Sequence, residues 1–121
     1  MNPELDGDLV LRVAASGDRT VVTAAGTIDY SNSGDLGRIL ESVLAGHAPR
    51  VVLALDRVGH VDSTGLALLV TADERARALG GWLRLTGLTG QMLRLLRTTN
   101  LDRRLGLYDT LDEALGDSGA E

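Results

Sequence analysis

The sequence contains no cysteine and no phenylalanine, and its only aromatic residues are Tyr30, Trp82 and Tyr108. Without cysteine the chain can form neither a disulfide framework nor a thiolate metal site. Since aromatic side chains are so few, a platform for stacking nucleic-acid bases is not expected. The core must therefore be built from Leu, Val, Ile and Ala.

Lysine is also absent, so all 12 cationic side chains are arginines, and they face 17 acidic residues for a net charge of −5. A general nucleic-acid-binding protein carries a basic face, because the phosphate backbone dominates its affinity. The charge balance therefore predicts no nucleic-acid partner. Four arginines near the end of the chain are expected to lie on a solvated helix end: Arg94, Arg97, Arg103 and Arg104.

Long apolar segments are missing as well, and the longest uninterrupted apolar runs have five residues. The first residues, MNPELDGDLV, lack a positive stretch followed by an apolar one. These observations predict neither a secretion signal nor a membrane span. We expect a cytoplasmic protein without a membrane partner.

Catalytic and cofactor motifs are not found. The two histidines, His47 and His60, are not part of an HExxH motif, and neither a GxxxxGK[ST] phosphate loop nor a GxGxxG turn occurs. Asp56 and Asp62 flank a polar stretch, where turn and helix-cap roles are more typical than a catalytic carboxylate pair. The sequence predicts a protein that is not an enzyme and has no metal or cofactor of its own.

The stretch 51–70 contains the clearest signal of secondary structure in the chain. The apolar run 51–55 (VVLAL) does not alternate, which is typical of a strand covered on both faces. Polar residues from Asp56 to Asp62 interrupt it, and Asp62-Ser63-Thr64-Gly65 then supplies helix-capping side chains. A central strand is therefore expected to lead into a helix that begins near Ser63.

The remaining patterns predict one domain over residues 1–121, with its core at about 9–115 and a polar tail at 117–121. A hairpin is expected at 9–13 and 20–28, further strands at 82–86 and 105–108, and helices around 36–44, 92–96 and 111–115. Strands that alternate with helices indicate an α/β fold with a mixed, mostly parallel five-stranded sheet. About four helices are expected to pack on one face.

The helix after Ser63 has two apolar faces. A helical wheel places one stripe toward the sheet: Gly65, Leu68, Leu69, Ala72, Ala76 and Leu79. Ser63, Leu66, Ala67 and Val70 fall on an adjoining face. That second face is either a docking patch beside the serine or a contact with a neighbouring helix, and the sequence does not decide between them.

A strand followed by Val-Asp-Ser-Thr-Gly-Leu at a helix start resembles the signature of the STAS domain, in particular of bacterial anti-sigma-factor antagonists. The resemblance extends roughly from Leu9 to Leu115 and includes Gly26-Thr27-Ile28-Asp29 and the segment 93–115. It implies an α/β sandwich with helices on one side of the sheet. This agrees with the fold class that the residue patterns predict.

The resemblance also implies a function, in which Ser63 is the phosphoacceptor. The unphosphorylated protein would bind an anti-sigma-factor serine kinase and release the sigma factor, and phosphorylation would end binding until a phosphoserine phosphatase reverses it. ATP and magnesium would belong to the kinase. The resemblance implies a partner surface with Asp29, Ser31, Asp62, Ser63, Thr64 and Gly65, and the adjoining helix face would add Leu66 and Val70. The alternative is a docking subunit of a signalling or lipid-transport complex, with Ser63 only as a helix cap.

Overall fold

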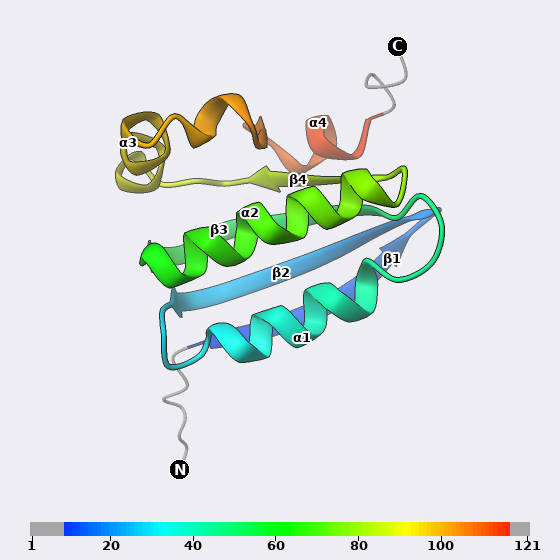
Figure 1. The fold of residues 1–121 in the computed structure, drawn as a ribbon, viewed down its shortest axis with the longest axis horizontal. Coiled ribbons are helices and arrows are strands. Elements are labelled where there is room, and N and C mark those ends of the chain that lie inside the picture. Colours follow the sequence, from blue (N-terminus) through cyan, green and yellow to red (C-terminus); the bar gives the residue numbers. More distant parts are fainter. Residues whose placement is uncertain (1–8, 117–121) are drawn as a thin grey trace.

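A computed structural model describes residues 9–116, so the predicted polar tail at 117–121 lies outside the described part (Figure 1). The described chain is an α/β domain built on one sheet with strand order β1-β2-β3-β4-β5. β1 and β2 are antiparallel, and every other neighbouring pair is parallel. The strands are β1 (Leu9–Ser16), β2 (Arg19–Ile28), β3 (Arg50–Val61), β4 (Trp82–Thr86) and β5 (Gly106–Tyr108). The predicted mixed, mostly parallel five-stranded sheet is confirmed.

Helices connect the strands as expected. They are α1 (Ser33–Val43), α2 (Ser63–Ala78), α3 (Gly90–Thr98) and α4 (Leu111–Leu115), with a short 3₁₀ helix η1 (Leu101–Arg103) before β5. Side chains cap two of the helices at their first turns: Thr89 Oγ1 accepts from Met92 N–H, and Thr110 Oγ1 accepts from Glu113 N–H. At α3 and α4 the threonine before the helix thus fixes where it starts.

The central strand β3 is covered on both faces, as its unbroken apolar run predicts. Val51, Val52, Leu53 and Leu55 are fully buried. The strand does not end at Asp56, however, but continues to Val61. Two irregularities in its pairing with β2 let it pass through the polar stretch without leaving the sheet.

α1, α2 and α3 cover one face of the sheet, and α1 and α2 lie side by side across it (Figure 1). Their buried side chains share a cluster with the sheet. The helical wheel of α2 is right for most positions, but Leu66 and Asp73 are also buried, whereas Leu68 is half-buried at the side facing α1. The two helices approach closely there, since a Cβ on Gly37 of α1 would lie 3.4 Å from Leu68 Cδ1.

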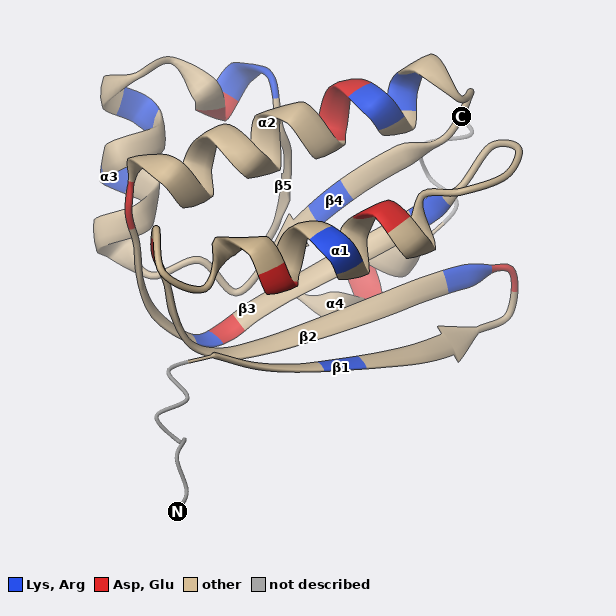
Figure 2. Cartoon of the chain, turned by 60° about the horizontal axis from the view of Figure 1, so that its bottom comes forward, with Lys and Arg blue, Asp and Glu red and all other residues tan. Residues whose placement is uncertain are grey.

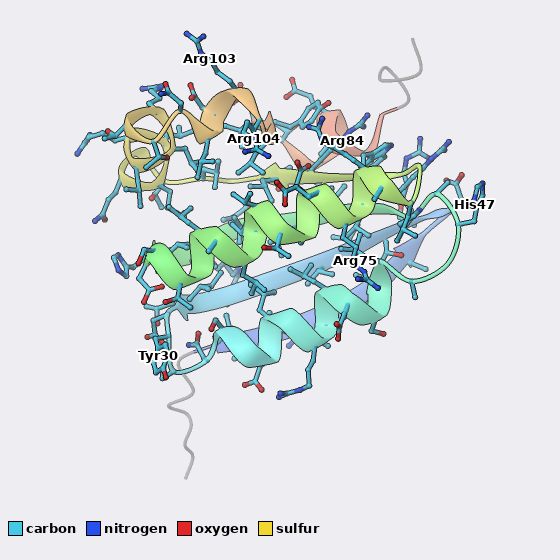
Figure 3. All side chains as sticks on the ribbon, viewed as in Figure 1. Tyr30, His47, Arg75, Arg84, Arg103 and Arg104 are labelled. Carbon is cyan, nitrogen blue, oxygen red and sulfur yellow. The ribbon has the colours of Figure 1, made fainter. Side chains whose placement is uncertain are left out.

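α4 lies on the other face of the sheet, where it contacts β3, β4 and β5. Arg84 alternates along β4 with the core residues Leu83 and Leu85, so it points away from α2, and it is nevertheless buried. Its Nη1 donates to the carbonyls of Ala114 (2.9 Å) and Gly116 (3.0 Å) (Figure 3).

The expectation that about four helices pack on one face of the sheet is wrong for α4, and Arg84 accounts for the difference. Its guanidinium carbon lies 3.8 Å from the ring centroid of Trp82 and 5.0 Å from that of Tyr108. Aromatic faces attract such a cation, and its N–H groups then satisfy the last carbonyls of the short helix. α4 is thereby held on the face opposite the other three helices.

Candidate functional site

Two loops meet where β2 and β3 end. These strands are parallel neighbours, with Ile28 paired to Val61 as their last pair. The loop 29–32 that leads into α1 and the junction at Asp62 that leads into α2 therefore leave the same edge of the sheet. Asp62 N–H donates to the carbonyl of Ile28 (3.0 Å), which holds the two loops together. Sites gather at this edge of parallel sheets.

The carboxylate of Asp62 serves both loops. Its Oδ1 accepts from Gly65 N–H (3.0 Å) and so caps α2, and its Oδ2 accepts from Tyr30 N–H (3.1 Å) on the other loop. Asp62 is therefore the N-cap, and Ser63 is the first residue inside the helix. The role of helix cap that the alternative reading gave to Ser63 belongs to its neighbour.

Ser63 is left exposed by this arrangement. Within residues 9–116 its hydroxyl has no hydrogen-bond partner, and the first turn of α2 has no acidic residue. The start of a helix combines unpaired N–H groups with the positive end of the helix dipole, so it accommodates a phosphate group well. Ser63 is thus a free hydroxyl at a position suited to an added anion.

The loop before α1 is stiffened by its own polar side chains. Asp29 Oδ1 accepts from both Ser31 Oγ (2.6 Å) and Ser31 N–H (2.9 Å). The Asn32 amide accepts from Asp29 N–H (2.9 Å) and donates to the carbonyl of Thr27 (2.9 Å). This network fixes the loop beside the start of α2.

The same network sets the charge of the loop. The hydrogen bond from the Ser31 hydroxyl is the largest cause that lowers the pKa of Asp29, and the backbone N–H groups of Ser31 and Asn32 and the charge of His60 add to it. Burial acts in the opposite direction but does not prevail. Because hydrogen bonds to a carboxylate favour its charged form, Asp29 is ionised at neutral pH.

Gly65 lets α2 begin close to the sheet. A Cβ at this position would lie 2.7 Å from Ile28 Cγ2 and 2.8 Å from Val61 Cγ1, which is too close for any side chain. The predicted site residue Gly65 therefore has a packing role, and it places Ser63 directly above the two strand ends. Thr64 next to it is half-buried.

The apolar face beside Ser63 divides into two parts. Leu66 is only 8% exposed and belongs to the core cluster, so the packing interpretation is correct for this residue and it offers no surface for a partner. Ala67 is exposed and Val70 is half-buried. These two residues form the apolar surface that continues from Ser63 along α2.

Tyr30 is a surface residue at this site to which sequence reasoning gave no role. Its side chain is 82% exposed and projects from the loop before α1 (Figure 3). An aromatic residue within an otherwise polar turn was the signal in the sequence. Together the structure places Asp29, Tyr30, Ser31, Asp62 and Ser63 at one end of the domain.

Two further observations limit the chemistry of the described residues. Between residues 9 and 116, no group of three or more His, Asp or Glu side chains is arranged to hold a metal ion. In the same range, none of the helices combines the length and the apolar character needed to cross a bilayer.

Comparisons with known proteins identify related chains. A protein of Thermotoga neapolitana that is provisionally named an anti-sigma factor antagonist is 35% identical over 66 residues, which are 54% of this chain and 58% of the relative. The chain thus matches less than two thirds of that relative's length. The crystal structure of an anti-sigma factor antagonist from Mycobacterium paratuberculosis has 28% identity and a TM-score of 0.80, over 88% of this chain and 91% of the other.

A second solved structure resembles this chain in fold alone. The Bacillus cell fate determinant SpoIIAA in its phosphorylated form has 15% identity and a TM-score of 0.67, over 88% of this chain and 96% of its own. A family model described as "Mlab, STAS domain" matches residues 11–112, which is most of the chain. The chain therefore belongs to the STAS-domain family.

Proposed function

We propose that this protein is an anti-sigma-factor antagonist that is switched by phosphorylation of Ser63. The unphosphorylated form binds an anti-sigma-factor serine kinase and so releases a sigma factor. The kinase supplies ATP and magnesium, and a phosphoserine phosphatase restores the binding form. The names of the similar proteins support the antagonist role, because both the Thermotoga and the Mycobacterium relatives carry it.

The observation that carries the proposal is the exposed, unbonded hydroxyl of Ser63 at the start of a helix that Asp62 already caps. A serine needed as a cap would lose that bond on modification. Here the hydroxyl is available to a kinase, and the fold does not depend on it. SpoIIAA, which shares the fold, has itself been solved in a phosphorylated form.

Phosphate would act through local charge. A phosphoserine adds roughly −1.5 to −2 charges at neutral pH. These charges would stand beside the carboxylates of Asp29 and Asp62 and next to the apolar Ala67 and Val70. Burying such a group in an interface is costly unless the partner supplies compensating charge. Phosphorylation therefore weakens docking without changing the fold.

The test uses the purified protein and its cognate kinase with ATP and magnesium, followed by mass mapping of the six serines. Label is expected on Ser63 alone. Ser63→Asp is expected to keep the wild-type circular dichroism spectrum and to bind the kinase at least about tenfold more weakly. Ser63→Ala is expected to bind as the wild type does and to escape control.

Ser42→Asp is the matched control, since it adds the same charge at an exposed serine near the other end of α1. It is expected to bind as tightly as the wild type. Label on another residue, or a folded Ser63→Asp that binds with unchanged affinity, contradicts the switch.

A second candidate function is that of a docking subunit in a signalling or lipid-transport complex, without phosphorylation. It is favoured by the description of the family model, which names Mlab and does not mention an anti-sigma-factor antagonist. In that case no co-encoded kinase transfers phosphate to Ser63. Val70→Arg would still weaken docking to the partner, because the surface around Ser63 serves both functions.

A further inference from the structure

The sheet face opposite α1 and α2 is only partly covered. α4 contacts β3, β4 and β5 on this face, whereas β1 and most of β2 have no described helix over them there. The side chains of Val10, Arg12, Thr23, Ala25 and Arg57 line a hollow of about 510 Å³ in this open part. We call it the open-face hollow. It lies on the opposite side of the sheet from the apolar cluster beneath α1 and α2.

A β-bulge directs Arg57 into the hollow. Thr23 pairs with Ala54, but Ala25, two residues further along β2, pairs with Arg57, three residues further along β3. In a regular ladder Ala25 would pair with Asp56, and Arg57 would point to the helix-covered face. The extra residue in β3 therefore places a cation on the open face, where a regular strand would place a carboxylate.

Among the described residues, the two arginines of the open-face hollow have no acidic partner. Arg12 and Arg57 are both exposed, and neither forms an ion pair or a hydrogen bond with any residue in 9–116. Arg50, on the same face, pairs with Asp18 at 3.1 Å. In a molecule with a net charge of −5, two unpaired guanidinium groups in one hollow are a local positive site.

The hollow also contains apolar residues beside the arginines. Val10 is 54% exposed and is one of four large hydrophobic residues that the described chain leaves exposed. It lies next to Ala25 across β1 and β2. The open-face hollow thus combines two cations with the apolar residues Val10 and Ala25. Figure 2 shows blue arginine segments on both strands that carry the cations, β1 and β3.

The spacing of the arginines suits an extended peptide. Arg12 pairs with Thr23 on β2, and Arg57 pairs with Ala25. Two strand spacings and an offset of two residues put their Cα atoms roughly 12 Å apart. In an extended chain, residues i and i+4 are separated by roughly 13 Å and lie on the same side as residue i+2.

We propose that the open-face hollow binds an extended acidic segment of a partner protein, with a carboxylate at positions i and i+4 and an apolar side chain at i+2. The carboxylates pair with Arg12 and Arg57, each able to donate two parallel hydrogen bonds. The apolar side chain covers Val10 and Ala25. This surface is separate from Ser63 and does not depend on the switch.

The test is an NMR titration of the ¹⁵N-labelled protein with the peptide acetyl-Thr-Glu-Thr-Leu-Thr-Glu-Thr-amide. Saturable shifts are expected at the amides of Val10, Arg12, Thr23, Ala25 and Arg57. The affinity should fall as salt is raised, because exposed charges are screened. The same peptide with Gln in place of both Glu residues should bind at least about tenfold more weakly.

Matched variants separate the site from general charge effects. Arg12→Gln and Arg57→Gln should each weaken binding about fivefold or more, and the double variant should abolish it. Arg94→Gln removes the same charge from an exposed position on α3 and should leave binding unchanged. Equal loss in the Arg94→Gln variant would overturn the proposal.

Three other outcomes also overturn it. One is the absence of shifts at millimolar peptide. Another is inorganic phosphate that gives the same shifts at equal concentration, which would indicate a small-anion site. The third is binding to phosphatidylglycerol vesicles without binding to the peptide, which would indicate a membrane surface.

Discussion

The two helix starts at the candidate site are held in different ways. At α1 the side chain of Asn32 makes no cap bond and instead ties the loop back to Asp29 and Thr27. At α2 the side chain of Asp62 caps the helix and also holds the neighbouring loop through Tyr30 N–H. The start of α1 is therefore stabilised only within its own loop, whereas the side chain at the start of α2 connects two loops.

The difference shows how an exposed serine without a hydrogen bond can stand at a helix start without weakening the fold. Both helices begin with a serine, Ser33 in α1 and Ser63 in α2. Ser33 is half-buried, whereas Ser63 is exposed. Because Asp62 caps α2, the hydroxyl of Ser63 is not needed for a cap bond.

The largest difference between the two helix starts is expected when a glycine in the first turn of each helix is replaced by alanine. Gly65→Ala should destabilise the protein by about 1–3 kcal/mol, since the added Cβ would lie 2.7 Å from buried Ile28 Cγ2. Gly34→Ala in α1 is the matched control, because the nearest atom is Arg38 Nη1 at 3.9 Å. It should stabilise by about 0.5–1 kcal/mol. Urea denaturation measures both, and equal effects would refute the close packing at α2.

The next largest effect concerns the two loop side chains. Asp62→Ala removes the cap and the bond across the loops and should cost about 1–2 kcal/mol of unfolding free energy. Asn32→Ala also removes two hydrogen bonds, both within one loop, and should cost about 1 kcal/mol. Hydrogen exchange should distinguish them: Asp62→Ala should raise exchange at Tyr30 and Gly65, whereas Asn32→Ala should affect Asp29. If the amide hydrogen of Tyr30 exchanges at the same rate in Asp62→Ala as in the wild type, the proposed connection between the two loops is contradicted.

Replacement of the serine itself should matter little for stability. Ser63→Ala is expected to change the free energy of unfolding by less than about 0.5 kcal/mol, as for other exposed positions without a bond. Thermal unfolding followed by circular dichroism measures this. A loss of about 1 kcal/mol or more would show that Ser63 caps α2 after all.

The smallest effect is electrostatic. Ser31→Ala removes the main cause of the lowered pKa of Asp29, so this pKa should rise toward its ordinary value. A lowered folded-state pKa stabilises the protein above the unfolded-state pKa, and the benefit is lost as pH falls through the folded value. In the Ser31→Ala variant, the free energy of unfolding should therefore fall less than in the wild type when the pH is lowered through the acid range. A ¹³C titration of the carboxyl group measures the shift, and the same pKa in Ser31→Ala and wild type would be the contrary result.

Local patterns predicted much of this fold. The apolar run 51–55 identified the central strand, and the residue pattern around 111–115 identified α4, which the structure shows to be capped by Thr110. The start of α2 near Ser63 was also predicted. The alternative function made Ser63 the helix cap, whereas the structure gives that role to Asp62. Two oxygen-bearing neighbours are equally able caps in a sequence, and only the backbone geometry separates them.

What the sequence did not predict depends on distant contacts. Leu66 is buried because α2 sits close to the sheet at Gly65, which a helical wheel does not show. The placement of α4 depends on Arg84, whose partners are 30 and 32 residues away. The bulge that turns Arg57 to the open face involves pairing between two strands and has no local signal.

The stacking of Arg84 on Trp82 has a spectroscopic consequence. Trp82 is the single tryptophan of the chain, and the guanidinium above its ring also holds the end of α4. If α4 detaches, Arg84 loses these carbonyls and water reaches the indole, so the fluorescence emission should change. The protein therefore contains a natural optical reporter of α4 docking, positioned on the sheet face opposite α2.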